Sequence, residues 1–341
     1  MTSVPGRRRG GGVRLSALAL PLSCILVLSG CAVLPGAVST QRIPDDTPAV
    51  NLDQVPFYPQ TAYDCGPAAL AEILTYAGAP ARPKELEPRT YVPDRQGTLQ
   101  TELLSQARVA GRLAYRVPGS LDALTQELQA GNPVLILQNL GLSWAPRWHY
   151  AVVVAVEPES DTLVLRSGTR REHRIAADVF DRTWARGGRW AMVATPPGRL
   201  PATAQPLTTF RAMADLEGTS GVKRALPYWR AARQRWPRQG RMALGLANAE
   251  YNTGDVEAAA AVLRGASTRS GDHKGEILNN LAVIEAELGH RKAAIAAAES
   301  AVAQGGDNVE RFRETLTEVR CGESGTTGCG PAETKQAAGT H

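Results

Sequence analysis

The sequence carries little excess charge outside its first residues. Four arginines near the N-terminus, which no acidic residue offsets, supply most of the formal net charge of +5: Arg7, Arg8, Arg9 and Arg14. Without them, 34 basic residues face 33 acidic ones. A nearly neutral chain lacks the basic surface with which proteins bind the phosphates of DNA or RNA. We therefore expect no nucleic-acid partner.

A cluster of metal-binding side chains is also missing. The five histidines and five cysteines are scattered, without the short ligand spacing of a zinc site. His173, His273 and His290 are accordingly expected on the surface. Nothing in the sequence calls for a metal or another cofactor.

The N-terminal apolar run, residues 15–28, is too short to span a hydrocarbon core of ~30 Å. It follows the arginines and ends at Leu28-Ser29-Gly30-Cys31. This arrangement resembles the signal peptide and lipobox of bacterial lipoproteins, in which the cysteine is diacylated and the preceding peptide is removed. A plain secretory signal or a short membrane anchor is the alternative.

The resemblance implies that residues 1–30 are a signal peptide and that Cys31 is the lipidated N-terminus. Ala32 follows, where Asp would be the usual signal for retention in the inner membrane, so we expect a lipoprotein of the outer membrane that faces the periplasm. Residues 31–51 are rich in Pro, Ala, Thr and Asp and lack an apolar period. We expect them to form a flexible tether, with the first domain starting at residue 52.

Three cysteines remain beyond Cys31. Cys321 and Cys329 bracket a loop of Gly, Thr and Ser and could form a disulfide in an oxidising periplasm, within a disordered tail over residues 321–341. Cys65 then has no partner. An unpaired cysteine in an exported protein is a candidate reactive thiol, because most such cysteines are paired.

Residues 52–197 pass from helical to strand patterns. Helices are expected first, and after Pro133 short β-branched runs predict strands, with one amphipathic helix between the last two. Helices followed by an antiparallel sheet predict an α+β domain. The expected helices are 67–76, 98–110, 121–130 and 178–186, and the expected strands are 134–138, 149–156, 162–167, 172–175 and 189–195.

The chain beyond residue 198 is alanine-rich and repeats itself. Residues 243–255 align with 278–290, which places Gly254 and Gly289 at 35 positions' distance, close to the tetratricopeptide period of about 34. A helix pair cannot bury its apolar face alone. We therefore expect an all-α tetratricopeptide-repeat solenoid over residues 207–320; an unrelated helical bundle is the alternative.

Cys65 is expected at the mouth of a helix that Gly66-Pro67 opens. Helix N-termini stabilise a thiolate, so the position predicts an acidic, nucleophilic thiol, although a buried small hydrophobe is the simpler reading of a cysteine. The Gln60 amide could donate, together with the Cys65 backbone N–H, to the oxygen of a tetrahedral intermediate. His149 opens an apolar strand, where it could take the thiol proton.

Together these residues resemble the papain-like family that trims double-glycine leaders in bacteriocin exporters, and its single-domain relatives. The resemblance covers about residues 52–197 and implies Cys65 as nucleophile, His149 as general base and Gln60 as oxyanion donor. The family usually ends the next strand with Asp-Pro to orient the histidine. Ser167 occupies that position here, and Asp161 lies earlier. A serine could hold the imidazole but would not stabilise imidazolium as a carboxylate does.

These observations predict a lipid-anchored cysteine peptidase that hydrolyses a peptide bond in an exported peptide or protein, with a protein partner on the repeats. One alternative is a non-catalytic lipoprotein scaffold, which binds through the repeats and a decayed peptidase fold. Another is a murein endopeptidase, but that family normally has Cys-Ser-Gly where this chain has Cys65-Gly66-Pro67. Trp144, Trp148 and Trp184 could line a substrate groove or pack in the core.

Overall fold

The structure of the protein, a computed structural model, describes residues 41–60, 64–95 and 97–321. The described residues fall within one compact unit. The expected signal peptide, the lipidation site at Cys31 and the cysteine at position 329 lie outside them.

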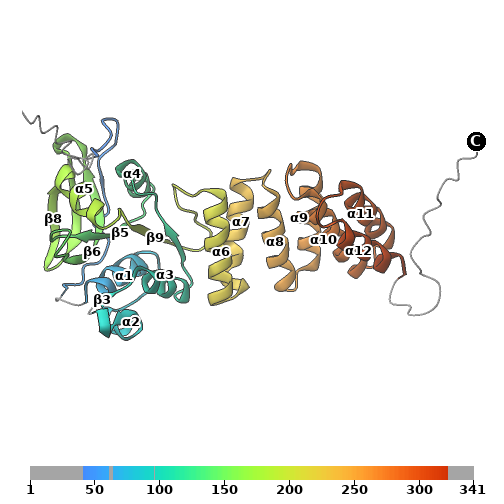
Figure 1. The fold of residues 1–341 in the computed structure, drawn as a ribbon, viewed down its shortest axis with the longest axis horizontal. Coiled ribbons are helices and arrows are strands. Elements are labelled where there is room, and N and C mark those ends of the chain that lie inside the picture. Colours follow the sequence, from blue (N-terminus) through green and yellow to red (C-terminus); the bar gives the residue numbers. More distant parts are fainter. Residues whose placement is uncertain (1–40, 61–63, 96, 322–341) are drawn as a thin grey trace, which may run out of the picture. The chain divides into compact units, whose positions relative to one another are not determined.

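An antiparallel sheet of seven strands is the centre of the N-terminal domain (Figure 1). Its order is β4-β9-β5-β6-β7-β8, and the short β1 pairs with β6. Two further strands, β2 and β3, form a separate ribbon. The bounds are β1 Val50–Asn51, β2 Tyr91–Val92, β3 Gly97–Thr98, β4 Leu113–Arg116, β5 Val134–Asn139, β6 Trp148–Glu157, β7 Thr162–Ser167, β8 Arg170–Ala176 and β9 Ala191–Thr195.

Helices cover both faces of this sheet, which confirms the α+β prediction. Successive side chains of β6 point to opposite faces, so Tyr150 and Val152 pack with α1 and α3, whereas Ala151 and Val153 pack with α4 and α5. The helix α2 lies against α1 and α3. The bounds are α1 Cys65–Tyr76, α2 Pro83–Thr90, α3 Gln100–Val109, α4 Leu121–Gln129 and α5 Ala177–Arg186.

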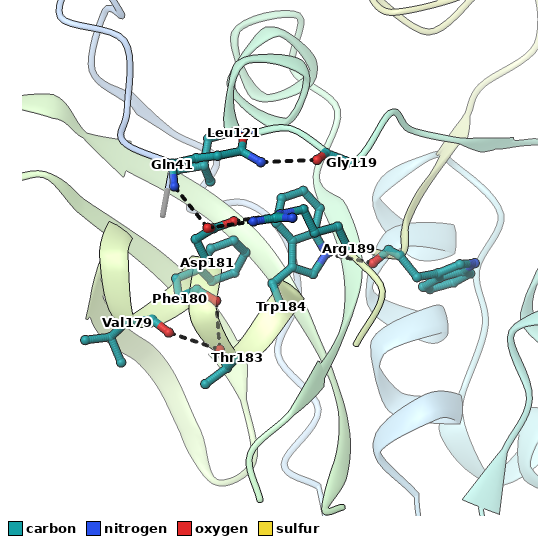
Figure 2. A network of polar contacts seen from close by, with 10 residues as sticks. Gln41, Gly119, Leu121, Val179, Phe180, Asp181, Thr183, Trp184 and Arg189 are labelled. Carbon is teal, nitrogen blue, oxygen red and sulfur yellow. Dashed lines mark hydrogen bonds and ion pairs between the residues drawn. The ribbon is translucent and has the colours of Figure 1, made fainter. Parts of the chain in front are cut away.

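Residues 41–51 belong to the folded domain, so the prediction of a flexible tether up to residue 51 is wrong for this part. The Gln41 backbone N–H donates to Asp181 in α5 at 3.0 Å (Figure 2), and its side-chain oxygen accepts from the Leu121 N–H at 2.7 Å. Ile43 is buried, and Val50–Asn51 adds a strand to β6. The polar composition hid a segment whose backbone groups have specific partners.

Seven helices follow the sheet domain within the described residues (Figure 1). The first three helix pairs each turn at a glycine with positive φ, namely Gly221 (+85°), Gly254 (+90°) and Gly289 (+76°). This conformation favours glycine, so Gly221 extends the repeat that the sequence indicated at the other two. The bounds are α6 Pro206–Ser220, α7 Val222–Arg235, α8 Gly240–Asn252, α9 Val256–Arg269, α10 Lys274–Glu287, α11 Arg291–Gln304 and α12 Val309–Cys321.

An ion pair recurs between successive helix pairs. Arg230 of α7 binds Glu250 of α8 at 2.8 Å, and Arg264 of α9 binds Glu285 of α10 at 2.5 Å. The third contact has the charges exchanged, with Glu299 of α11 and Arg320 of α12 at 2.5 Å. Equivalent positions carry equivalent contacts at each interface, so the region is built as a helical repeat. Its assignment as tetratricopeptide remains a prediction.

The first repeat helices share their core with the sheet domain. Apolar residues of α6, α7 and α8 join the cluster on the α4–α5 face of the sheet. The buried Tyr228 hydroxyl donates to the Thr195 carbonyl at 2.6 Å and accepts from the Leu113 N–H at 3.1 Å. The buried Glu127 carboxylate accepts the backbone N–H groups of Ala202 and Thr203. The segment that connects the two regions is therefore pinned by hydrogen bonds.

Candidate active site

Cys65 is the first residue of α1, where the sequence placed it. Pro67 suits this first turn because its missing N–H would have no intrahelical partner. Gly66 is required by close packing, since a Cβ there would lie 2.7 Å from the Thr98 side chain. The half-buried thiol interacts with the backbone N–H of Tyr150, the residue that follows His149. Cys65 and His149 therefore come from separate elements to one place.

Burial raises the pKa of the Cys65 thiol above its ordinary value. The backbone N–H groups of Tyr150 and Gly66 lower this pKa, and the neighbouring Asp64 carboxylate raises it. The sequence predicted an acidic thiol from the helix N-terminus. That prediction is wrong for the free protein, because desolvation outweighs the stabilisation that the backbone dipoles give to a thiolate.

His149, the second residue of β6, is held by Ser167 at the end of β7. The His149 Nε2 and Ser167 Oγ atoms lie 2.8 Å apart. Burial, together with the charges of His173 and Arg147, lowers the pKa of His149 to about 4. Asp161, the alternative partner, precedes the other end of β7 and accepts the Ile43 N–H instead. The imidazole is thus oriented by a hydroxyl and is neutral at pH 7.

Gln60 is buried and clamped to the turn that follows Ser167. Its backbone N–H donates to the Gly168 carbonyl at 2.9 Å, and its Oε1 accepts the Gly168 N–H at 3.0 Å. Because Oε1 is occupied, Nε2 is the free end of the amide, and it is buried without a partner among the described residues. A buried unsatisfied donor requires an explanation. An oxyanion that forms during a reaction would supply the missing acceptor.

Residues 52–192 match the peptidase C39-like family. The match covers most of the N-terminal sheet domain, the C39-like domain. No curated protein matches the chain.

Two solved structures resemble the C39-like domain. One is a protein of Bacillus anthracis assigned as a C39-like peptidase, with 17% identity over 43% of this chain and 98% of that chain and a TM-score of 0.38. The other is the peptidase domain of Streptococcus ComA, a bifunctional ABC transporter of a quorum-sensing pathway. It has 18% identity over 42% of this chain and 98% of that chain, with a TM-score of 0.34.

Two buried ionisable residues of the C39-like domain, which the sequence analysis missed, support the segment that carries Gln60. Arg166 of β7 donates to the carbonyl groups of Asp53 and Val55, and Glu72 of α1 accepts the Tyr58 N–H at 3.0 Å. Burial raises the pKa of Glu72 to about 8. Both residues could have been found from the sequence, because each is an ionisable side chain at an otherwise apolar, inward-facing position of a strand or helix.

The other residues that the sequence singled out lie in the core, on the surface or at the end of α12. Trp184 is a core residue whose indole N–H donates to the Trp190 carbonyl, whereas Trp144 and Trp148 are exposed. His173 is not an isolated surface residue, since its charge acts on His149. Cys321, at the end of α12, is disulfide-bonded, and the cysteine at position 329 lies outside the described residues.

Proposed function

We propose that this chain is a lipid-anchored cysteine peptidase that hydrolyses a peptide bond in an exported peptide or protein. The observation that carries the proposal is the meeting of three groups: the Cys65 thiol at a helix N-terminus, the His149 imidazole held by Ser167, and the unpaired Nε2 of the clamped Gln60. Each group fills a different role in acyl transfer.

Acylation starts from a neutral thiol and a neutral imidazole. With the His149 Nε2–H donated to Ser167, the other ring nitrogen, Nδ1, is left as the acceptor for the thiol proton. As that proton moves, Sγ of Cys65 bonds to the carbonyl carbon of the substrate. The carbonyl oxygen becomes an oxyanion, which accepts hydrogen bonds from Gln60 Nε2 and the Cys65 backbone N–H.

Breakdown of this intermediate releases the amine product. The C–N bond breaks as the proton on His149 passes to the leaving nitrogen, and a thioester with Cys65 remains. A water molecule then attacks the thioester and gives a proton to His149. The C–S bond breaks, the proton returns to Sγ of Cys65, and the carboxylic acid product leaves. All proton transfers use the same imidazole, so no cofactor is needed.

Two other regions complete the proposal. A lipid on Cys31 would hold the protein at the periplasmic face of the outer membrane, and the helical repeats would bind a protein partner. None of the described helices is long and apolar enough to cross a bilayer. These parts rest on the sequence alone.

The test is cleavage of a complex peptide mixture by the chain that starts at residue 32. Product N-termini are identified by mass spectrometry for the wild type, Cys65→Ala and His149→Ala, with the exposed His290→Ala as matched control. The proposal expects cleavage by the wild type and the control, and none by the other two. Cleavage that persists in Cys65→Ala would overturn it.

The scaffold function is the second candidate, and one observation favours it. Ser167 stands where a carboxylate would stabilise imidazolium, and burial raises the pKa of the nucleophile, so both charged states of the pair are disfavoured. This candidate expects the wild type and Cys65→Ala to bind the same peptides with equal affinity and to leave them uncut.

A further inference from the structure

The hairpin between β5 and β6, residues 139–148, exposes an unusual number of large apolar side chains. Leu140 is 44% exposed, Leu142 57%, Trp144 83% and Trp148 57%. A contiguous group of this kind marks an interaction site more often than isolated exposed residues do.

The loop is built to hold this shape. Asn139 is buried, and its Oδ1 accepts the backbone N–H groups of Gly141 and Arg147, each at 2.9 Å. A Cβ at Gly141 would lie 2.3 Å from the Ala145 carbonyl oxygen, so the chain crosses itself closely there. The apolar side chains are therefore presented by an ordered turn.

The hairpin and the α5 side chain that hydrogen-bonds to it carry only positive charge. Residues 139–149 include no acidic side chain, and Arg147 lies among them. Arg186, the last residue of α5, is exposed and donates through Nε to the Asn139 carbonyl. Within the described residues neither guanidinium forms an ion pair. Exposed Trp and Leu beside unpaired Arg suit the interface of an anionic bilayer.

The entry point of the chain places such a bilayer near the hairpin. Gln41 is bonded to Asp181 of α5, and Arg186, five residues further along this helix, is bonded to the hairpin. Five helical residues span about 8 Å. Nine residues separate Cys31 from Gln41, and the ten steps between these two residues reach at most about 36 Å. A lipid on Cys31 would thus keep the hairpin within reach of the membrane.

We propose that residues 140–148 insert into the interfacial region of an anionic lipid bilayer. The insertion goes beyond the peptidase function and needs no catalysis. Because Trp148 directly precedes His149, the docked hairpin places the active site at the membrane surface, where lipid-anchored or membrane-associated substrates are found.

The experiment measures binding of residues 32–341, with Cys65→Ala, to vesicles of phosphatidylglycerol and phosphatidylethanolamine. Leaving out the lipidated cysteine separates insertion from anchoring. Trp144→Ala combined with Leu142→Ala is expected to lower the partition coefficient at least about tenfold, because two large apolar side chains no longer leave water on binding. The matched control, Val283→Ala with Tyr251→Ala, removes exposed apolar side chains of α10 and α8 and is expected to leave binding unchanged.

Two further measurements define the mode of binding. Brominated lipids should quench the indole fluorescence of the parent protein, and this quenching should fall in Trp144→Ala. Arg147→Gln should weaken binding to anionic vesicles but not to phosphatidylcholine. Equal partitioning of the hairpin variant and the parent, with unchanged thermal unfolding, would overturn the proposal. Loss of peptide binding without any loss of vesicle binding would assign the hairpin to the substrate instead.

Discussion

Burial sets the protonation of the site, and the hydroxyl of Ser167 does not offset it. A carboxylate at Ser167 would hold His149 as imidazolium, whereas the neutral Oγ contributes a hydrogen bond without charge. Burial, together with the charges of His173 and Arg147, lowers the pKa of the imidazole to about 4, and burial raises the pKa of the thiol. The sequence identified Gln60, Cys65, His149 and Ser167 because each lies in a local motif or at a strand end.

The first prediction concerns Ser167. Ser167→Ala should lower the rate at which a peptidyl vinyl sulfone modifies Cys65 by about threefold to tenfold, because one hydrogen bond that orients His149 is lost. Ser167→Asp should raise the pKa of His149 by about one to three units. The acid limb of the rate, near pH 4 in the wild type, would then move upwards. Mass spectrometry from pH 3 to 9 measures the rate of Cys65 modification and the position of its acid limb, with the exposed Ser143→Ala variant as control.

The second prediction concerns the buried Glu72. Its pKa rises from 4.5 to about 8 on folding, so the folded state binds the extra proton between these values. Its contribution to stability is therefore complete below pH 4.5 and is lost as pH rises through 8. Glu72→Gln should flatten the fall in the free energy of unfolding between pH 5 and 9, measured with urea. An unchanged slope, like that expected for the exposed Glu318→Gln, would contradict it.

At the scale of elements, helices and strands long enough to show a sequence pattern were predictable, and shorter elements were not. The alternating and apolar runs gave β5 to β9, and the amphipathic stretches gave α1, α3, α4 and α5. Strand β4, of four residues, and β1, of two, are too short to show a period, and their place depends on partners far along the chain. Helix α2 contains Pro88, which hides it from a helical reading. Gly168, Arg166 and Glu72 likewise support Gln60 or its segment through contacts between residues that are distant in the sequence. No local sequence motif indicates these three residues.

The third prediction uses two glycines inside repeat helices. A Cβ at Gly245 of α8 would lie 2.4 Å from the Trp229 ring of α7, whereas one at Gly265 of α9 would meet nothing within 4 Å. Gly265→Ala should raise the free energy of unfolding by about 0.5–1 kcal/mol, because alanine favours the helix. Gly245→Ala should lower it by about 1–3 kcal/mol, because the helices must separate. Thermal unfolding of both variants measures these changes. A change of the same sign in the free energy of unfolding of both variants would show that helix propensity alone determines it.

At the scale of the molecule, the sheet domain and the repeats are coupled. The sequence placed a boundary between residues 197 and 207, where the composition changes. In the structure this segment is bonded to Glu127, and the cluster that packs against α4 and α5 continues into α6, α7 and α8. The edge strand β4 also packs against α6. The repeats therefore complete the C39-like domain as well as extend it.

The last prediction tests this coupling through Tyr228. Its hydroxyl lies between the Leu113 N–H of β4 and the Thr195 carbonyl of β9, and burial raises its pKa to about 12. Tyr228→Phe leaves both backbone groups buried without their partner, which should lower the free energy of unfolding by about 1–3 kcal/mol. The exposed Tyr251→Phe is the control and should change it little.

Hydrogen exchange followed by mass spectrometry shows where this loss appears. If the two regions open together, the amides of β4 and β9 and those of α6 and α7 should exchange faster by the same factor in Tyr228→Phe, because one cooperative unit has one opening free energy. Faster exchange in α6 and α7 alone would mean that the repeats detach while the sheet stays closed. In that case the shared core would be a docking contact between separate folding units, and a partner bound to the repeats could loosen them without disturbing Cys65 and His149.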